Sequence, residues 1–156
     1  MYNHAPKNYK CPFCLIVKGV ENEHAYTKQS DIIYKDKYVA AWVSAHWWLP
    51  KNKAHIIVTT NKHIENIYDL PLNLSNKVHA LEKQVALALK KVYKCDGVSS
   101  RQHNEQYGDQ DIWHYHIHVF PRYKNDDLYG PNKKRSLSNP KDRKSYAEKL
   151  KRYFTK

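Results

Sequence analysis

The clearest alternation of polar and hydrophobic positions lies in residues 113–121, where histidines alternate with apolar or aromatic residues. A period of two predicts a strand, because successive side chains of a strand point to opposite faces. His114, His116 and His118 would share one face. The opposite face would carry Tyr115, Ile117 and Val119. Pro121 is expected to end the strand, because proline cannot donate a hydrogen bond to a central ladder.

Four other segments have the β-branched and alternating composition of strands. They are residues 32–34, 38–43, 55–59 and 98–104. The first two flank the turn-like residues 35–37 and predict a hairpin, and the third predicts a central strand that begins with His55. The fourth is joined to the histidine strand by the short segment 105–110, which favours antiparallel pairing.

Two segments have the pattern of helices. The first has apolar residues three, four or seven positions apart, at Leu74, Val78, Leu81, Val85, Leu89 and Val92. Asn73 or Ser75 can cap its start, and Gly97 lies where a helix commonly ends in the left-handed conformation. Asn139 followed by Pro140 predicts the start of a second helix. Its apolar face would consist of Tyr146, Leu150, Tyr153 and Phe154. The fold class is therefore α+β.

Length and charge narrow the class of protein. The 156 residues are expected to form one main domain over residues 1–130, followed by a basic tail with a short amphipathic helix over residues 131–156. The first ten residues are polar and no run has the length of a transmembrane helix, so a soluble, cytoplasmic protein is expected. A formal charge of +12 fits nucleotides, polyphosphates and nucleic acids as partners. Much of the excess follows Pro131 and is equally typical of a solvated tail.

The cysteines indicate a metal site. Cys11 and Cys14 have the spacing of half a zinc site. A redox dithiol is the alternative, but that motif expects a preceding strand and a following helix, which the Tyr-, Asn- and Lys-rich start of the chain does not favour. The third cysteine, Cys95, is expected to be a half-buried packing residue.

The histidine row allows several kinds of chemistry. Imidazole can bind zinc, transfer protons near neutral pH or attack an electrophile such as phosphorus. Three histidines that hold a catalytic zinc with a bound water are one interpretation. Three histidines in a straight row, however, span too far to bind one ion unless the strand bends. The row therefore favours a division of tasks between the histidines.

Several motifs together resemble the histidine-triad (HIT) superfamily of nucleotide hydrolases and transferases. They are the His114-x-His116-x-His118 triplet followed by Val119-Phe120, Asn104 and Gln110 before it, and the segments 39–43, 55–58 and 62–68. The cysteine pair resembles the zinc-carrying bacterial branch, and the resemblance extends over roughly residues 10–124. It implies a half-barrel of about five antiparallel strands with one long helix, paired into a homodimer.

The resemblance also implies an activity, namely attack at the α-phosphate of adenylated or dinucleoside polyphosphate substrates. His116 would be the nucleophile and become a nucleotidyl-histidine. His118 would donate to phosphate oxygens, and His55 would orient the triad. Asn104 and Gln110 would bind phosphate or ribose. Water would then release the nucleoside monophosphate.

In the zinc-carrying branch, a closed Cys2His2 site would be formed by Cys11, Cys14, His63 and His114. A zinc ion with four protein ligands is structural, so it would rigidify the catalytic strand rather than activate water. The simpler alternatives are a pair of free thiols and a surface position for His63.

Two features depart from the family pattern. Asp111 stands where many relatives have Ser or Thr, which places an anion near the expected phosphate path. The segment 44–53 is longer than in many relatives. Its Trp47 and Trp48 could stack on a base or pack in the core, and packing is the favoured interpretation. Two other functions stay open: a nucleic-acid-binding or strand-end-processing protein, suggested by the basic charge, and a zinc-stabilised nucleotide-binding module without strong catalysis.

Overall fold

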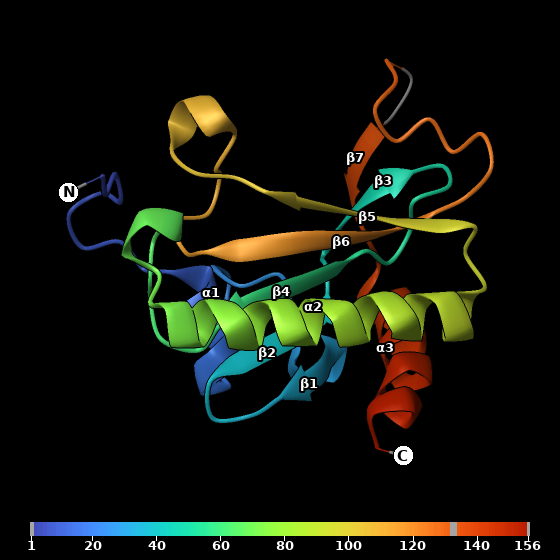
Figure 1. The fold of residues 1–156 in the computed structure, drawn as a ribbon, viewed down its shortest axis with the longest axis horizontal. Helices are drawn as coiled ribbons and strands as arrows, with labels where there is room; N and C mark the ends of the chain where they lie inside the picture. Colours follow the sequence, from blue (N-terminus) through green and yellow to red (C-terminus); the bar gives the residue numbers. More distant parts are fainter. Residues whose placement is uncertain (1, 132–133, 156) are drawn as a thin grey trace.

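The computed structural model describes residues 2–131 and 134–155 (Figure 1). Over these residues the α-helices and strands are α1 Pro12–Lys18, β1 Ile32–Lys35, β2 Val39–Val43, β3 His46–Leu49, β4 Ile56–Thr60, α2 Leu72–Tyr93, β5 Gly97–Gln102, β6 His116–Arg122, β7 Lys134–Leu137 and α3 Pro140–Phe154. Over the same residues, no helix has both the length and the apolar character needed to cross a membrane.

Five strands form one antiparallel sheet in the order β1-β2-β4-β6-β5. The predicted hairpin of β1 and β2 and the predicted pairing of β5 with β6 are confirmed. β4 is the middle strand and pairs with β6, so that Ile57 lies opposite His118 and Thr59 opposite His116. With α2 across the sheet and α3 at the C-terminal end, the expected α+β fold with one long helix is confirmed.

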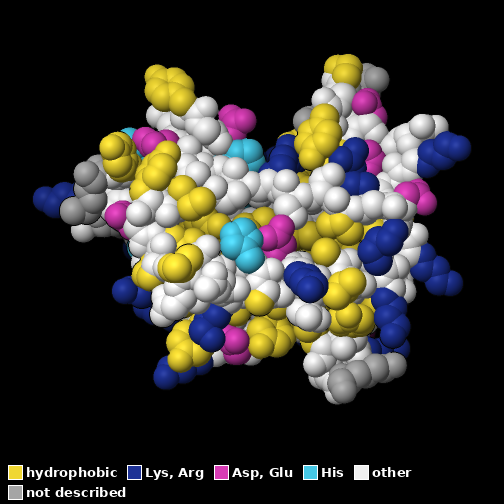
Figure 2. Space-filling model, viewed as in Figure 1, with side chains coloured by type: hydrophobic (Ala, Val, Ile, Leu, Met, Phe, Trp, Pro, Cys, Tyr) yellow, Lys and Arg dark blue, Asp and Glu magenta, His cyan; other side chains and the backbone are white. Residues whose placement is uncertain are grey.

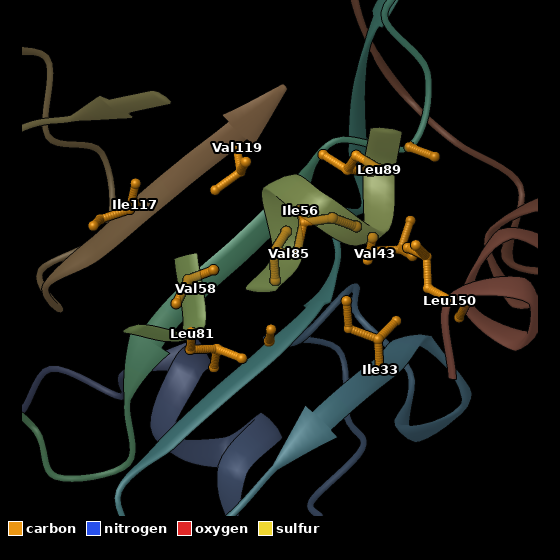
Figure 3. Packing of buried hydrophobic residues seen from close by; sticks show 14 of the residues in the cluster. Ile33, Val43, Ile56, Val58, Leu81, Val85, Leu89, Ile117, Val119 and Leu150 are labelled. Carbon is orange, nitrogen blue, oxygen red and sulfur yellow. The ribbon is translucent and has the colours of Figure 1, made fainter. Parts of the chain in front are cut away.

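The face of the sheet beneath α2 holds the main hydrophobic core (Figure 3). Its buried aliphatic side chains include Ile33, Val43, Ile56, Val58, Ile117 and Val119 from the sheet, Leu81, Val85 and Leu89 from α2, and Leu150 from α3. Removing this apolar surface from water is the main favourable term in folding. Because Ile117 and Val119 of β6 point into this layer, the histidines between and before them face the other side of the sheet.

The other face of the sheet is covered by α1, a helix that the sequence pattern did not indicate. The Sγ of Cys11 accepts a hydrogen bond from the backbone N–H of Cys14 and caps the start of α1, and Gly19 ends it with a φ of 80°. Phe13 and Ile16 of α1 pack against Trp42 and other buried residues of the sheet. The segment that holds the cysteine pair is thereby fixed against the histidine-bearing face.

The ends of α2 differ from the prediction. The helix begins at Leu72 after Pro71, without a side-chain cap, so neither Asn73 nor Ser75 is its N-cap. It ends at Tyr93, and the next residue, Lys94, takes the left-handed conformation with a φ of 52°, whereas Gly97 is the first residue of β5. The Nζ of Lys90 donates to the carbonyls of Cys95 and Asp96, and these bonds hold the turn without a glycine.

β6 is shorter at its start and longer at its end than predicted. It begins at His116, and it continues through Pro121 to Arg122. The pairing with β4 ends where Val119 lies opposite Ile56, so β4 has no residue opposite Pro121. The missing N–H of proline therefore costs no hydrogen bond to β4, and the Pro121 carbonyl accepts one from the Asn52 side chain at 3.0 Å.

The chain after β6 returns to the sheet. β7 pairs with β3 in a two-stranded ribbon that the sequence pattern did not predict. α3 begins as predicted, with the Asn139 side chain capping it and Pro140 in its first turn. Its buried Arg143 donates to Asp31 at 2.8 Å. On the face of the molecule shown in Figure 2, Lys and Arg side chains gather around α3.

The proposed boundary between a main domain and a tail at residues 130 and 131 stays a prediction.

Candidate active site and metal centre

Three histidines form a continuous chain on the face of the sheet opposite α2. His116 and His118 come from β6, and His55 immediately precedes β4. The Nε2 atoms of His116 and His118 lie 3.2 Å apart, and the Nδ1 of His118 lies 3.2 Å from the Nε2 of His55. The Nδ1 of His116 lies 2.7 Å from the carbonyl oxygen of His114. Two of the three predicted triad histidines are thus joined to His55.

These contacts fix the proton positions of the chain. A carbonyl only accepts, so the Nδ1–H of His116 donates to His114, and because burial keeps this ring neutral, its Nε2 carries a lone pair. The Nε2–H of His118 then donates to His116, and the Nε2–H of His55 donates to His118. The Nδ1 of His55 is left without a partner among residues 2–131 and 134–155. All three rings are neutral in this arrangement.

Burial favours the same neutral state. It lowers the pKa of His116 to about 4, although the hydrogen bond to the His114 carbonyl acts in the opposite direction. Burial, followed by the positive charge of neighbouring groups, holds the pKa values of His55 and His118 well below the ordinary histidine value. A neutral imidazole, whose unprotonated nitrogen carries a lone pair, is the form that attacks an electrophile.

Four residues from three parts of the chain form a second cluster. Cys11 and Cys14 come from the start of α1, His63 follows β4, and His114 precedes β6. Their ligand atoms all lie within 4.8 Å of one another. The Nδ1 of His114 lies 3.3 Å from the Sγ of Cys11 and 3.6 Å from that of Cys14, and the Nδ1 of His63 lies 3.4 Å from the Sγ of Cys14.

This cluster fits a tetrahedral zinc ion. Sulfur and nitrogen ligands at ordinary zinc distances lie about 3.6 Å from each other, close to the separations seen here. The Nε2–H of His114 donates to the Thr60 carbonyl at 2.9 Å, which leaves its Nδ1 lone pair directed at the cysteines. Hydrogen bonds, first from Cys11 and then from His114 and His63, lower the pKa of the Cys14 thiol and favour the thiolate that zinc requires.

The bend before β6 explains how the histidine row is divided. Because the strand begins at His116, His114 lies outside it and turns toward the cysteines. The ring of Phe13 lies 5.0 Å from that of His116 and 5.9 Å from that of His114, measured between ring centres. The two clusters are therefore neighbours but do not share ligands.

Two cavities meet beside the histidine chain. A polar cleft of about 470 Å³ is lined by Ser44, His46, Trp48, His55, Arg101, His103, Gln106, Asp109, Gln110, Asp111, His118 and Arg135. A more apolar cavity of about 170 Å³ reaches His116 and includes Phe13, Ile16, Trp42 and Ile57 in its lining. Ser44, His46, Asp111 and Arg135 line both. Trp47 is buried in the core as expected, whereas Trp48 lines the cleft, so the packing role predicted for Trp48 is wrong.

Asn104 and Gln110 hold the loop beside the cleft. The Gln110 side chain accepts from the N–H of Glu105 and donates to the carbonyls of Glu65 and Ile112. The Asn104 side chain accepts from the N–H of Ile67. Gln110 lines the cleft, but Asn104 is absent from its described lining. Their predicted contacts with phosphate or ribose stay predictions.

Several cleft residues were not found from the sequence. Arg101 lies opposite His118 in the pairing of β5 with β6, a position that the antiparallel register alone could have indicated. His103 also lines the cleft, and its Nδ1–H donates to the Gly108 carbonyl at 2.7 Å. Arg135 arrives from β7, and nothing in its local sequence indicates that it reaches the site.

Comparisons with known proteins agree with this geometry. The HIT domain family model matches residues 26–125. The protein hit of Bacillus subtilis is 28% identical over 120 residues, which are 77% of this chain and 76% of that protein. The structure of a Zn-bound histidine triad family protein from Mycobacterium smegmatis superposes with a TM-score of 0.74 and 23% identity, covering 94% of each chain. The structure of Plasmodium falciparum diadenosine triphosphate hydrolase superposes with a TM-score of 0.70 and 17% identity, covering 92% of this chain and 97% of that one.

Proposed function

Because the chain belongs to the HIT domain family, a superfamily of nucleotide hydrolases and transferases, we propose that it hydrolyses or transfers nucleoside monophosphates from adenylated or dinucleoside polyphosphate substrates. The observation that carries this proposal is the neutral chain from His116 through His118 to His55, which ends where two cavities meet. A relative with the same fold is a diadenosine triphosphate hydrolase.

The two cavities suit the two parts of a nucleotide. Apolar side chains such as Phe13 and Ile16 form a surface for a base or ribose next to His116. The polar cleft beyond His118 contains Arg101 and Arg135, which attract phosphate oxygens. A substrate that spans both would hold its α-phosphate beside the two histidines.

In the proposed reaction the Nε2 lone pair of His116 forms a bond to the α-phosphorus, and the bond from phosphorus to the leaving group breaks. The Nδ1–H of His116 remains hydrogen-bonded to the His114 carbonyl, and this bond stabilises the positive charge that develops on the ring. The Nε2–H of His118, released from His116, turns to a phosphate oxygen or supplies the proton of the leaving group. Water then attacks the phosphorus, the bond from phosphorus to the Nε2 of His116 breaks, and the nucleoside monophosphate leaves with the oxygen of the water. The proton that the water loses restores His118 if His118 protonated the leaving group, and otherwise passes to solvent.

We further propose that Cys11, Cys14, His63 and His114 bind a structural zinc ion, as their separations suit it. With four protein ligands such an ion supplies rigidity and no open position for water. One of these four ligands, His114, also provides the carbonyl that orients His116. Fixing this backbone segment would therefore fix the nucleophile.

The test is a search for the covalent intermediate. Brief reaction with diadenosine tetraphosphate or another adenylated substrate, quenched without acid, should give a nucleotidyl adduct in the wild type by intact-protein mass spectrometry. His116→Ala should remove both adduct and turnover, since it removes the attacking nitrogen. The matched control is His79→Ala on the exposed side of α2, which should keep both. Unchanged turnover in His116→Ala would exclude His116 as the nucleophile.

A further inference from the structure

An ion pair lies between the two cavities. The Nη2 of Arg135 donates to the Oδ2 of Asp111 at 2.9 Å, and 47% and 45% of the two side chains are exposed. Both residues line the cleft and the apolar cavity. The backbone of Arg135 is fixed by β7, where Arg135 pairs with Trp48 of β3. The contact therefore bridges the position where a nucleotide would pass from one cavity to the other.

A second arginine faces the same cleft from β5. Arg101 lies opposite His118, and its guanidinium packs 4.5 Å from the ring centre of Phe120 and 5.3 Å from that of Tyr129. Its buried Nε has no hydrogen-bond partner in the described part of the chain. The aromatic contacts hold the guanidinium in place, and its positive charge lies at the cleft, where it attracts an anion.

The two acidic residues of the cleft set the balance of charge. Asp109 and Asp111 line it together with Arg101 and Arg135. With Arg135 paired to Asp111, the carboxylate that lines both cavities is neutralised, and an entering phosphate meets less repulsion. A half-exposed ion pair held by one hydrogen bond is weak, whereas a guanidinium binds phosphate oxygens through two parallel hydrogen bonds.

We propose that Arg101 and Arg135 form a subsite for the phosphates of the leaving group, and that Asp111 holds Arg135 until a polyphosphate displaces it. This inference rests on the proposed function and narrows its substrate class. Preferred substrates would carry at least two phosphates beyond the α-phosphate. Substrates whose leaving group is an uncharged amine would gain nothing from Arg135.

The experiment compares two substrates attacked at the same phosphorus, diadenosine tetraphosphate and adenosine 5′-phosphoramidate. Measured in an Asp111→Asn background, so that no unpaired carboxylate is left beside the α-phosphate, Arg135→Ala should raise KM for the tetraphosphate roughly tenfold or more, because a charge-assisted hydrogen bond is lost, and leave KM for the phosphoramidate within about twofold. Asp111→Asn should lower KM for the tetraphosphate about two- to fivefold, because the competing anion is removed. Lys134→Ala, an exposed neighbour on β7, is the matched control and should change neither value.

Two results would overturn the subsite. One is an equal rise in KM for both substrates when Arg135→Ala is added to Asp111→Asn, and the other is a rise in KM for the tetraphosphate in Asp111→Asn alone. If the wild type turned over neither substrate, the proposed function would fail instead, and calorimetric binding of inorganic tripolyphosphate would decide the subsite separately. Weaker binding in Arg135→Ala than in Lys134→Ala would support it, and equal binding would refute it.

Discussion

His55 is the residue of the histidine chain that combines deep burial with a ring nitrogen that has no hydrogen-bond partner among the described residues. It is 1% exposed, its ring stacks 4.4 Å from that of Phe120, and one of its nitrogens is unpaired among the described residues. A charged imidazole in this position would lose its hydration without gaining a counter-ion. The ring is therefore held neutral, with a pKa well below the ordinary histidine value because of burial.

We expect this burial to make stability depend on pH. In the unfolded chain His55 takes up a proton near its ordinary pKa of about 6.5, whereas in the folded chain it does not. The contribution of His55 is thus fully present above about pH 7 and is lost as the pH falls below about 6.5, by at most about 1.4 kcal/mol per pH unit. Denaturant titrations from pH 8 to 5 would measure it.

The matched comparison is His55→Gln, which keeps a polar side chain that does not titrate. Its free energy of unfolding should decline less steeply with falling pH than that of the wild type, while other groups contribute equally to both. Parallel curves for the two proteins would contradict a neutral buried His55.

At this scale the sequence was informative wherever a fixed period applied. The alternation in residues 113–121 correctly separated Ile117 and Val119 from His116 and His118. It could not indicate which ring donates to which, because the His114 carbonyl and His55 complete the chain from outside the strand.

Among the elements, α1 depends most on contacts outside itself. Seven residues are too few for a helix to be stable alone, and its cysteines face histidines from two distant segments. We therefore expect zinc to be part of the folded α1. Elemental analysis should find about one zinc per chain in the wild type, and Cys14→Ser should lose most of it because one ligand is missing.

Cys95→Ala is the control, since Cys95 is buried in the other core cluster and lies away from the zinc cluster. It should keep the zinc. Removal of the metal by a chelator should also make α1 the first site of limited proteolysis. Full zinc content in Cys14→Ser would show that the four residues are not the ligands.

Elements formed by neighbouring residues were predicted, and elements formed by distant partners were not. The periodicity of α2 and the β1–β2 hairpin are local features and were found. β3 and β7 pair although they lie far apart in the sequence. β7 is also a largely exposed strand, with no alternation of buried residues. Only the tertiary structure reveals that this ribbon carries Arg135 to the cleft.

For the whole molecule, α3 closes the main core. Leu150 is fully buried against the cluster beneath α2, and Arg143 joins α3 to Asp31 inside the protein. Leu150→Ala should lower the free energy of unfolding by about 2–5 kcal/mol, because it removes buried methyl groups and leaves a cavity. Thermal or denaturant unfolding would measure the loss.

Ser145→Ala, at an exposed position of the same helix, should change stability by only a few tenths of a kcal/mol. A loss below about 1 kcal/mol in Leu150→Ala would mean that α3 does not dock on the core in solution.

Some of the basic side chains that contribute to the net charge of +12 are already paired inside the protein. Arg143 is buried with Asp31, and Arg122 pairs with Asp126 at 2.7 Å. Arg101 and Arg135 face the cleft. Lys and Arg side chains also gather around α3 (Figure 2), and nucleic-acid binding and the homodimer stay predictions.

The alternation in β6 places the residues that stabilise the fold and the residues that face the cavities on opposite sides of one strand. Substitutions at Ile117 or Val119 act on the layer beneath α2, whereas substitutions at His116 or His118 act on the opposite side of the sheet. Substitutions beneath α2 can therefore change thermal stability without touching the reacting groups, whereas substitutions at His116 or His118 change the chemistry without removing contacts from the main core. After gene duplication, one copy could diverge in the cleft without having to rebuild the interior that keeps it folded.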